Sequence, residues 1–132
     1  MSVSRVSSTP EADEWIRRLA KQHGPLLFHQ SGGCCDGSAP MCYPRNEFRV
    51  GGSDVYLGSI CGQPFYIGGP QFEYWEHTHL IIDVVEGRGG GFSLEAPEGV
   101  RFLTRSRLFT DDEAAELERL GPPPRGPQHD AA

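Results

Sequence analysis

Three of the four cysteines of this 132-residue chain lie within nine residues of one another, in a glycine-rich segment. Cys34 and Cys35 are adjacent, and Cys42 follows seven residues after Cys35. Adjacent cysteines seldom bridge to each other without strain, and the glycines permit positive φ, so the segment can turn several thiols toward one centre. Thiolates select zinc or iron. The segment therefore predicts a zinc or iron site, although its spacing differs from the paired Cys-x-x-Cys of structural zinc sites.

A second group of candidate ligands lies between Glu73 and His79. Residues two apart on a strand face the same side, so an extended segment would present His77 and His79 to one metal, with Glu73 or Asp83 as an oxygen ligand. His-x-His followed four residues later by Asp83 resembles the metal motif of cupins. Asp83 stands where cupins have Glu, and Gln71 stands where they have glycine.

Charge balance favours a site that combines both groups. Ionised thiols in one small loop repel each other, a bound cation removes that cost, and a neutral imidazole adds a ligand without adding negative charge. The predicted metal ligands are Cys34, Cys35, Cys42 and His77, and the further candidates are His29, His79 and Glu73.

Other interpretations of these residues stay open. Cys34 or Cys35 can be a small buried apolar residue, and Cys61, within an apolar run, is predicted to fill a core or a turn. His29 can cap a backbone carbonyl at a strand end, or it can activate Cys34 or Cys35 as a nucleophile. His79 can make only a local hydrogen bond in a surface hairpin. The chain contains no G-x-S-x-G, H-E-x-x-H or P-loop motif that would favour a hydrolase or phosphoryl transfer.

The two ends of the chain are predicted to be helical. Thr9 followed by Pro10 has the form of an N-cap, the apolar residues that follow recur at helical spacing, and Gly24 ends the pattern. Thr110–Glu113 is a capping-box sequence, and its helix ends at Gly121.

The middle of the chain is predicted to be sheet, because its short apolar runs are rich in β-branched and aromatic residues. The predicted strands cover residues 26–28, 48–50, 55–60, 65–67, 80–85, 92–94 and 100–103. Residues 87–91 are glycine-rich and predict a hairpin loop. The fold class is therefore mainly β (α+β), a compact antiparallel β domain with short N- and C-terminal helices.

Length and composition predict one globular domain over residues 1–121 and a disordered tail over 122–132. There is no apolar run of about 18 residues and no signal-like apolar region at the N-terminus, which favours a cytoplasmic protein that does not enter a membrane. The net charge of −6 disfavours nucleic-acid binding. Exposed edges of a small sheet make a homodimer plausible.

Three segments resemble a family of small bacterial proteins known as a domain of unknown function: Phe28–Ser38, Phe72–Thr78 and Gly91–Gly99. The resemblance covers roughly residues 12 to 110. Members of that family are often encoded beside aldehyde dehydrogenases, which implies such an enzyme as a partner.

Two segments also resemble the A-type iron–sulfur carriers, which have the HesB-like fold. Ser31–Cys34 is similar to their Gly-Gly-Cys-Ser-Gly turn, and Gly91–Pro97 to their Gly-Phe-x-Phe-x-Asn-Pro segment. Those carriers complete their site with a C-terminal Cys-Gly-Cys pair, which the segment Phe102–Phe109 lacks. Three arginines lie at or beside that segment instead, and they can receive a carboxylate or an acidic patch of a partner: Arg101, Arg105 and Arg107.

The sequence thus predicts an accessory metal-binding protein linked to aldehyde or alcohol oxidation, HesB-like in architecture, with zinc or iron, including an iron–sulfur centre, at the cysteine loop. Two alternatives remain. One is a small metalloenzyme or thiol-dependent enzyme that acts on an aldehyde or its adduct, and the other is a metal-free interaction module.

Overall fold

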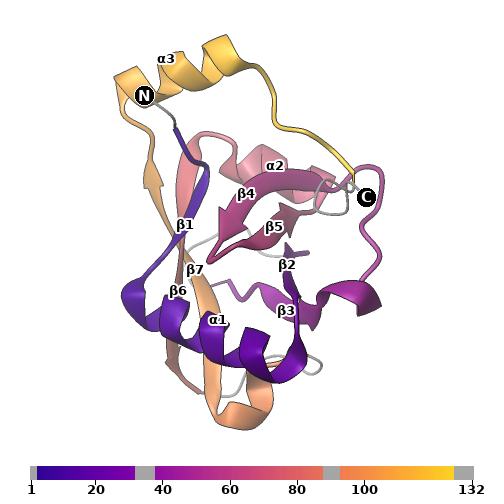
Figure 1. Ribbon diagram of the computed structural model, residues 1–132. Helices are drawn as coiled ribbons and strands as arrows, with labels where there is room; N and C mark the ends of the chain where they lie inside the picture. The colour runs from indigo at the N-terminus through magenta and orange to yellow at the C-terminus, as the bar shows by residue number, and fades with distance from the viewer. Residues whose placement is uncertain (1–2, 32–37, 88–92, 127–132) are drawn as a thin grey trace.

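The structure is a computed structural model that describes residues 3–31, 38–87 and 93–126. This part of the chain forms two mixed sheets and three α-helices (Figure 1). The first sheet has the order β1-β6-β7, with β1 (Val6–Ser8), β6 (Thr78–Glu86) and β7 (Val100–Leu108). The second has the order β3-β2-β5-β4, with β2 (Leu26–Gln30), β3 (Met41–Pro44), β4 (Val55–Ile60) and β5 (Gln63–Ile67).

The predicted α+β class with mostly antiparallel pairing is confirmed, with two exceptions in strand direction. The pairs β2–β3, β4–β5 and β6–β7 are antiparallel. The pairs β1–β6 and β2–β5 are parallel. Parallel neighbours need a crossover between them. β3 and β4 lie between β2 and β5 in the chain, and α1 (Pro10–His23) and the whole second sheet lie between β1 and β6.

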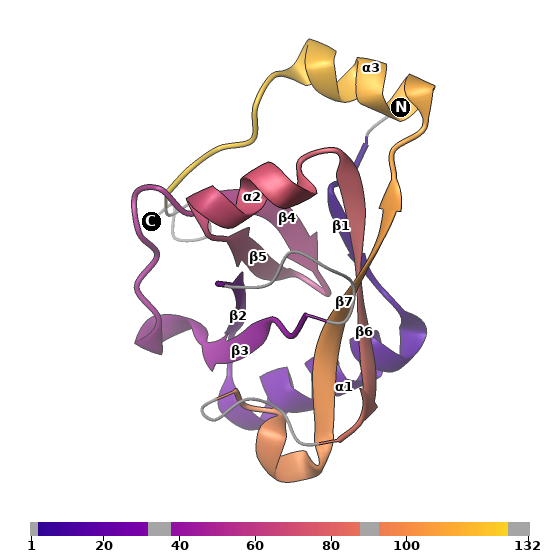
Figure 2. The same ribbon diagram turned by 180° about the vertical axis from the view of Figure 1, so that it is seen from behind.

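Both predicted helices are present, with the predicted caps. The side chain of Thr9 accepts a hydrogen bond from the Ala12 N–H at the start of α1, and Gly24 ends the helix at a φ of 84°. Thr110 and Glu113 form the reciprocal capping box of α3 (Asp111–Leu120). In Figures 1 and 2, α1 and α3 lie at opposite ends of the molecule.

A third helix, α2 (Gly69–Trp75), occupies part of a segment that was expected to be extended. Its N-cap is Gly68, so the sequence lacks the capping side chain that marks the start of the other two helices. Two predicted strands are absent from the described residues, because neither 48–50 nor 93–94 is a strand. A 3₁₀ turn, Arg45–Glu47, precedes the first of these segments, and a second 3₁₀ turn, Ala96–Glu98, precedes β7. Residue 92 and most of the predicted hairpin loop 87–91 lie outside the described residues.

The main core is packed between α1 and the two sheets. Three phenylalanines join the sheets at its centre: the Phe28 ring lies 6.2 Å from that of Phe65 and meets that of Phe102 edge-on at 5.3 Å. All three are fully buried, as are Ile16 and Leu80. Burial of this apolar surface is the main source of stability for a domain of this size.

A second apolar cluster covers the other face of the four-stranded sheet. It consists of buried Leu27, Val50 and Tyr66 with half-buried Tyr43, Phe48 and Tyr56. Because side chains alternate across a strand, Phe28 faces the main core while Leu27 and His29 face this second cluster. All five residues of β2 are consequently buried.

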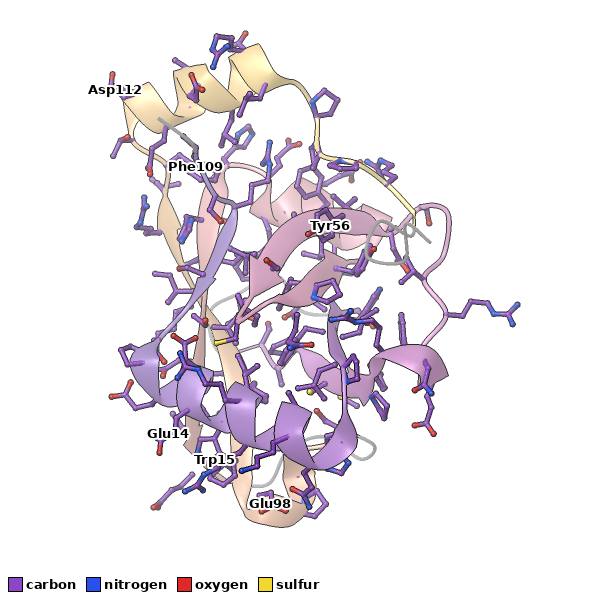
Figure 3. The ribbon with its side chains drawn as sticks, viewed as in Figure 1. Glu14, Trp15, Tyr56, Glu98, Phe109 and Asp112 are labelled. Atoms are coloured by element: carbon purple, nitrogen blue, oxygen red, sulfur yellow. The ribbon has the colours of Figure 1, made fainter. Side chains whose placement is uncertain are left out.

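The segment after α3 differs from the expected disorder of residues 122–132. Pro124 accepts a hydrogen bond through its carbonyl from the Tyr56 N–H (2.9 Å), and the Gly126 N–H donates to the Asp54 carbonyl (2.8 Å). Residues 122–126 therefore cover the edge of β4, beside Tyr56 (Figures 1 and 3). A proline-rich segment lacks N–H donors but keeps its carbonyls, which is what an edge with free N–H groups needs. Residues 127–132 lie outside the described part.

Deletion of residues 122–132 is expected to lower the free energy of unfolding by about 2 kcal/mol, because each lost backbone hydrogen bond costs about 1 kcal/mol. Deletion of 127–132 alone keeps both bonds and is the matched control. Urea denaturation of the two truncated chains measures the difference. Equal stabilities would show that the contact with β4 contributes nothing.

Asp83 on β6 connects α1 to β7. Its Oδ1 accepts hydrogen bonds from the Thr9 hydroxyl (2.9 Å) and the Val84 N–H (2.8 Å), and its Oδ2 pairs with Arg105 Nε at 2.8 Å. Partial burial, taken alone, would raise the pKa of Asp83, but the bonds from Arg105, Val84 and Thr9 outweigh it and hold the pKa below its ordinary value of 3.8. Asp83 is therefore a structural carboxylate.

Asp83→Asn is expected to destabilise the protein by about 1 to 2 kcal/mol at pH 7, through loss of the charge-assisted bond to Arg105. A lowered folded-state pKa contributes stability above the unfolded pKa and loses it as pH falls, so the difference from wild type should shrink below about pH 4. Urea denaturation at pH 7 and across acidic pH tests this. A difference that is independent of pH would contradict it.

Candidate metal site

The most unusual polar arrangement in the described residues surrounds His29, near the end of β2. Its Nδ1 is hydrogen-bonded to the Ser31 hydroxyl at 2.7 Å. Its Nε2 lies 3.0 Å from Asp54 Oδ1, but the two groups lack the alignment of a hydrogen bond. Nε2 is thus the one buried side-chain nitrogen or oxygen without a hydrogen-bond partner in the part of the chain that the structure describes.

The second apolar cluster keeps water away from this imidazole. His29 is only 6% exposed, and the centre of its ring lies 4.9 Å from that of Phe48, which stacks on Tyr43. Tyr66 is the register partner of His29 on the neighbouring strand β5. A buried polar atom without a partner costs about 1 to 3 kcal/mol, so an arrangement that leaves one here calls for an explanation.

The hydrogen bond to Ser31 bears on which of the two ring nitrogens of neutral His29 carries the proton. If Nδ1–H donates to Ser31, Nε2 carries a lone pair that faces a carboxylate oxygen. Two acceptors held 3.0 Å apart, one of them on a buried ring, repel each other. A cation between them removes that repulsion, and metal-bound histidines commonly donate their other ring N–H to a neighbouring oxygen. The donor set therefore fits a bound metal ion.

Residues 32–37, which include Cys34 and Cys35, lie outside the described residues. The residues on either side are held by β7. Thr104 donates through its N–H to the Ser38 carbonyl (2.7 Å) and through its hydroxyl to Gln30 Oε1 (2.8 Å). Both ends of the loop that contains the two cysteines are thus joined to one buried residue of β7, and its first end begins beside His29.

Cys42 belongs to the main core. It is fully buried, and its N–H donates to the Ser93 hydroxyl (2.8 Å), which in turn donates to buried Glu95. Burial and then the nearby Glu95 charge raise the pKa of the Cys42 thiol strongly. Burial also raises the pKa of Glu95, although hydrogen bonds from Ser93 and from the Phe102 N–H oppose it. Cys42 is the register partner of Phe28, so its side chain faces the main core, on the side of the sheet opposite to His29.

His77 lies far from Cys42. It follows α2 in the turn before β6, its side chain is 85% exposed, and its Nε2 lies 3.3 Å from a Glu76 carboxylate oxygen. The Phe109 N–H bonds to the His77 carbonyl, whereas Cys42 connects through Ser93 and Glu95 to Phe102. Seven residues of extended chain separate Phe102 from Phe109, roughly 20 Å. The structure therefore does not bring His77 and Cys42 together.

Glu73 and His79 also depart from the expected strand arrangement. Glu73 is exposed on α2. His79 is buried on β6, with Nε2 hydrogen-bonded to the Ser7 hydroxyl and Nδ1 to the Ser4 carbonyl, both at 2.7 Å. Because both ring nitrogens already have partners, His79 joins β1 to β6. Within residues 3–31, 38–87 and 93–126, no cluster of three or more metal-ligating side chains occurs.

Two of the three arginines expected to meet a partner's carboxylate already pair with this chain. Arg105 binds Asp83, and Arg107 binds both carboxylate oxygens of Glu113 at 2.8 and 3.0 Å.

A cavity of about 550 Å³ lies beneath α3 and is lined in part by His77, Leu117 and Phe109. Figure 3 shows Phe109 just below that helix.

Asp54 is the site residue that sequence reasoning missed. It ends the turn Gly51-Gly52-Ser53 and has no regular spacing to His29, which is 25 residues earlier. Only the pairing of β2, β5 and β4 brings the start of β4 across the sheet to His29. Glycine-rich turns that end in Asp are common in hairpin loops, so the local sequence gave no signal of a ligand.

The fold is thus an α+β domain in which buried His29 faces the partly exposed carboxylate of Asp54, at the start of a segment that contains two cysteines. Residues 15–108 match the family described as Domain of unknown function (DUF779), so the chain belongs to that family. Comparisons with curated proteins and with solved structures gave no match. No helix among the described residues is both long enough and apolar enough to cross a membrane.

The two described cysteines are expected to resist alkylation in the folded protein. Cys42 should react with iodoacetamide at pH 8 only after unfolding, because burial keeps its thiol protonated. Cys61 packs beside α1, and burial, followed by its hydrogen bond to Asp13, raises its pKa to about 11, so it should react slowly. Peptide mass spectrometry of native and urea-unfolded samples measures both. Rapid modification of Cys42 in the native sample would contradict this assignment.

Proposed function

We propose that the protein is an accessory metal-binding protein linked to aldehyde or alcohol oxidation, with zinc or iron held at the cysteine loop. The observation that carries the proposal is the buried His29 Nε2, which lacks a hydrogen-bond partner and faces Asp54 where that loop begins. The proposed ligands are His29, Cys34 and Cys35. Cys42 is left out of this set because its side chain faces the main core, opposite to His29, and His77 is left out because its side chain is 85% exposed beside Glu76.

Chain length is compatible with this ligand set. Cys34 is three residues after Ser31, whose hydroxyl contacts His29, and three extended residues span at most about 10 Å. A bound zinc or iron ion would supply the positive charge that keeps neighbouring thiols ionised near neutral pH. Ser31 would orient the His29 ring, and Phe48 would exclude water from it.

The link to aldehyde or alcohol oxidation rests on the resemblance described for the sequence, which proposes an aldehyde dehydrogenase as the partner. A reducing cytoplasm is the proposed location, because it keeps adjacent thiols free to bind metal. A homodimer is the proposed assembly. The HesB-like architecture stays a proposal, and it is supported by the resemblance of Ser31–Cys34 and Gly91–Pro97 to segments of the A-type carriers.

The test compares metal content in two histidine variants of the full chain, purified without oxygen. Wild type should carry zinc or iron in stoichiometric amount, His29→Ala should lose most of it, and exposed His77→Ala should keep it. Elemental analysis measures the content, and circular dichroism confirms folding. His29→Gln, which keeps a polar side chain of similar length, serves if the alanine variant fails to fold.

Metal-free wild-type protein, or full metal occupancy in both His29 variants, would overturn the proposal. Metal-free protein would favour the interaction module, for which the cavity beneath α3 provides an apolar surface.

A thiol-dependent enzyme that acts on an aldehyde or its adduct is the second candidate. The observation that favours it is the 2.7 Å bond between Ser31 and His29 Nδ1, because it places a potential general base at the start of the cysteine loop. A small metalloenzyme would need the metal to keep an open coordination position. If the protein is such an enzyme, the peptide that contains Cys34 and Cys35 should be alkylated more slowly in metal-free His29→Gln than in metal-free wild type.

A further inference from the structure

We propose that Asp54 is an oxygen ligand of the metal, so that the site takes a single divalent ion, zinc or ferrous iron, and not an iron–sulfur cluster. The inference rests on the proposed function, because it concerns the same ion. It adds a ligand that neither the cysteine spacing nor the histidine pattern contains.

The distance between the two donor atoms fits one shared ion. His29 Nε2 and Asp54 Oδ1 are 3.0 Å apart. Histidine nitrogens and carboxylate oxygens bind zinc at about 2.0 to 2.2 Å, so two such donors on one ion lie about 3 to 3.5 Å from each other. The two side chains therefore need little or no movement to bind the same ion.

Asp54 is fixed in place before any ion binds. Its Oδ2 accepts a hydrogen bond from the Gly51 N–H at 2.8 Å, which leaves Oδ1 directed at His29. Its backbone N–H donates to the Gly51 carbonyl, and its carbonyl accepts from the Gly126 N–H. A carboxylate held at both its backbone and its second oxygen has little conformational freedom left to lose on binding.

The two atoms lie within salt-bridge distance, at 3.0 Å, but they lack the alignment of a hydrogen bond. A protonated His29 would stabilise the pair best by directing Nε2–H along the line to Oδ1, and that alignment is missing. A cation bound to both atoms has no such requirement for an N–H direction, and it needs an unprotonated Nε2, which is the form in which Nδ1–H donates to Ser31.

An oxygen ligand restricts the kind of metal centre. Iron–sulfur clusters are held mainly by cysteine thiolates, and histidine replaces some of them in Rieske centres. The imidazole of His29 and the carboxylate of Asp54 together suit zinc or a single ferrous ion. Acid-labile sulfide should therefore be absent from protein purified without oxygen.

The decisive variant is Asp54→Asn in the full chain, because it gives opposite results for the two roles. Asparagine can keep the bond from Gly51 through its carbonyl oxygen and can donate its amide N–H to His29 Nε2. If Asp54 is a ligand, metal-free Asp54→Asn should melt at or above the temperature of metal-free wild type. Zinc should bind it at least about tenfold more weakly, and the zinc-induced rise in melting temperature should be largely lost.

If the pair is only structural, metal-free Asp54→Asn should melt below metal-free wild type, and zinc should bind both proteins equally. That result would overturn the inference and leave the proposed function standing. Wild type that binds neither zinc nor ferrous iron would overturn both. Asp112→Asn, an exposed change of the same charge on α3, is the control and should bind zinc as wild type does. Thermal melts and zinc titrations of chelator-treated protein provide both readouts.

Discussion

Burial of β2 on both faces is the constraint on which the rest of the structure depends. The main core covers the Phe28 face, and the second apolar cluster covers the face that carries Leu27 and His29. Every polar group near the end of this strand must therefore find its partner inside the protein. Gln30 does so through Thr104. His29 does so at only one of its two ring nitrogens, and the candidate site follows from that deficit.

β7 transmits this constraint to the other sheet. Thr104 bonds to both Gln30 and Ser38, while Phe102 contributes its ring to the core and its N–H to Glu95. A single strand thus fixes the two ends of the cysteine loop and the buried chain that leads to Cys42. Thr104 therefore fixes the chain at Gln30, before the segment that contains Cys34 and Cys35, and at Ser38, after it.

Features encoded by neighbouring residues were predictable from the sequence, and features that depend on distant contacts were not. The two capped helices were found because Thr9 and Thr110 form their caps within one turn of chain. β1 and β3 were missed because each is only three or four residues long and is defined by its partner strand. Cys42 was assigned to the loop by spacing, whereas its register opposite Phe28 places it in the core. His29 was a candidate, but its partner Asp54 became visible only once β4 was placed in the sheet.

The apolar surroundings of His29 determine what the His29–Asp54 pair can do. Near water, a histidine and a carboxylate 3.0 Å apart would gain little from each other, because solvent screens both groups. Because Phe48 covers the His29 ring, this nitrogen is best stabilised by either a well-aligned N–H···O hydrogen bond to Asp54 or a cation shared with it. Nε2 lacks the alignment of a hydrogen bond to Asp54, and Nδ1 is already hydrogen-bonded to Ser31. The same burial that makes the unpaired nitrogen costly thus makes a bound cation more strongly stabilising, which is how a stable fold can hold a site ready for a metal ion.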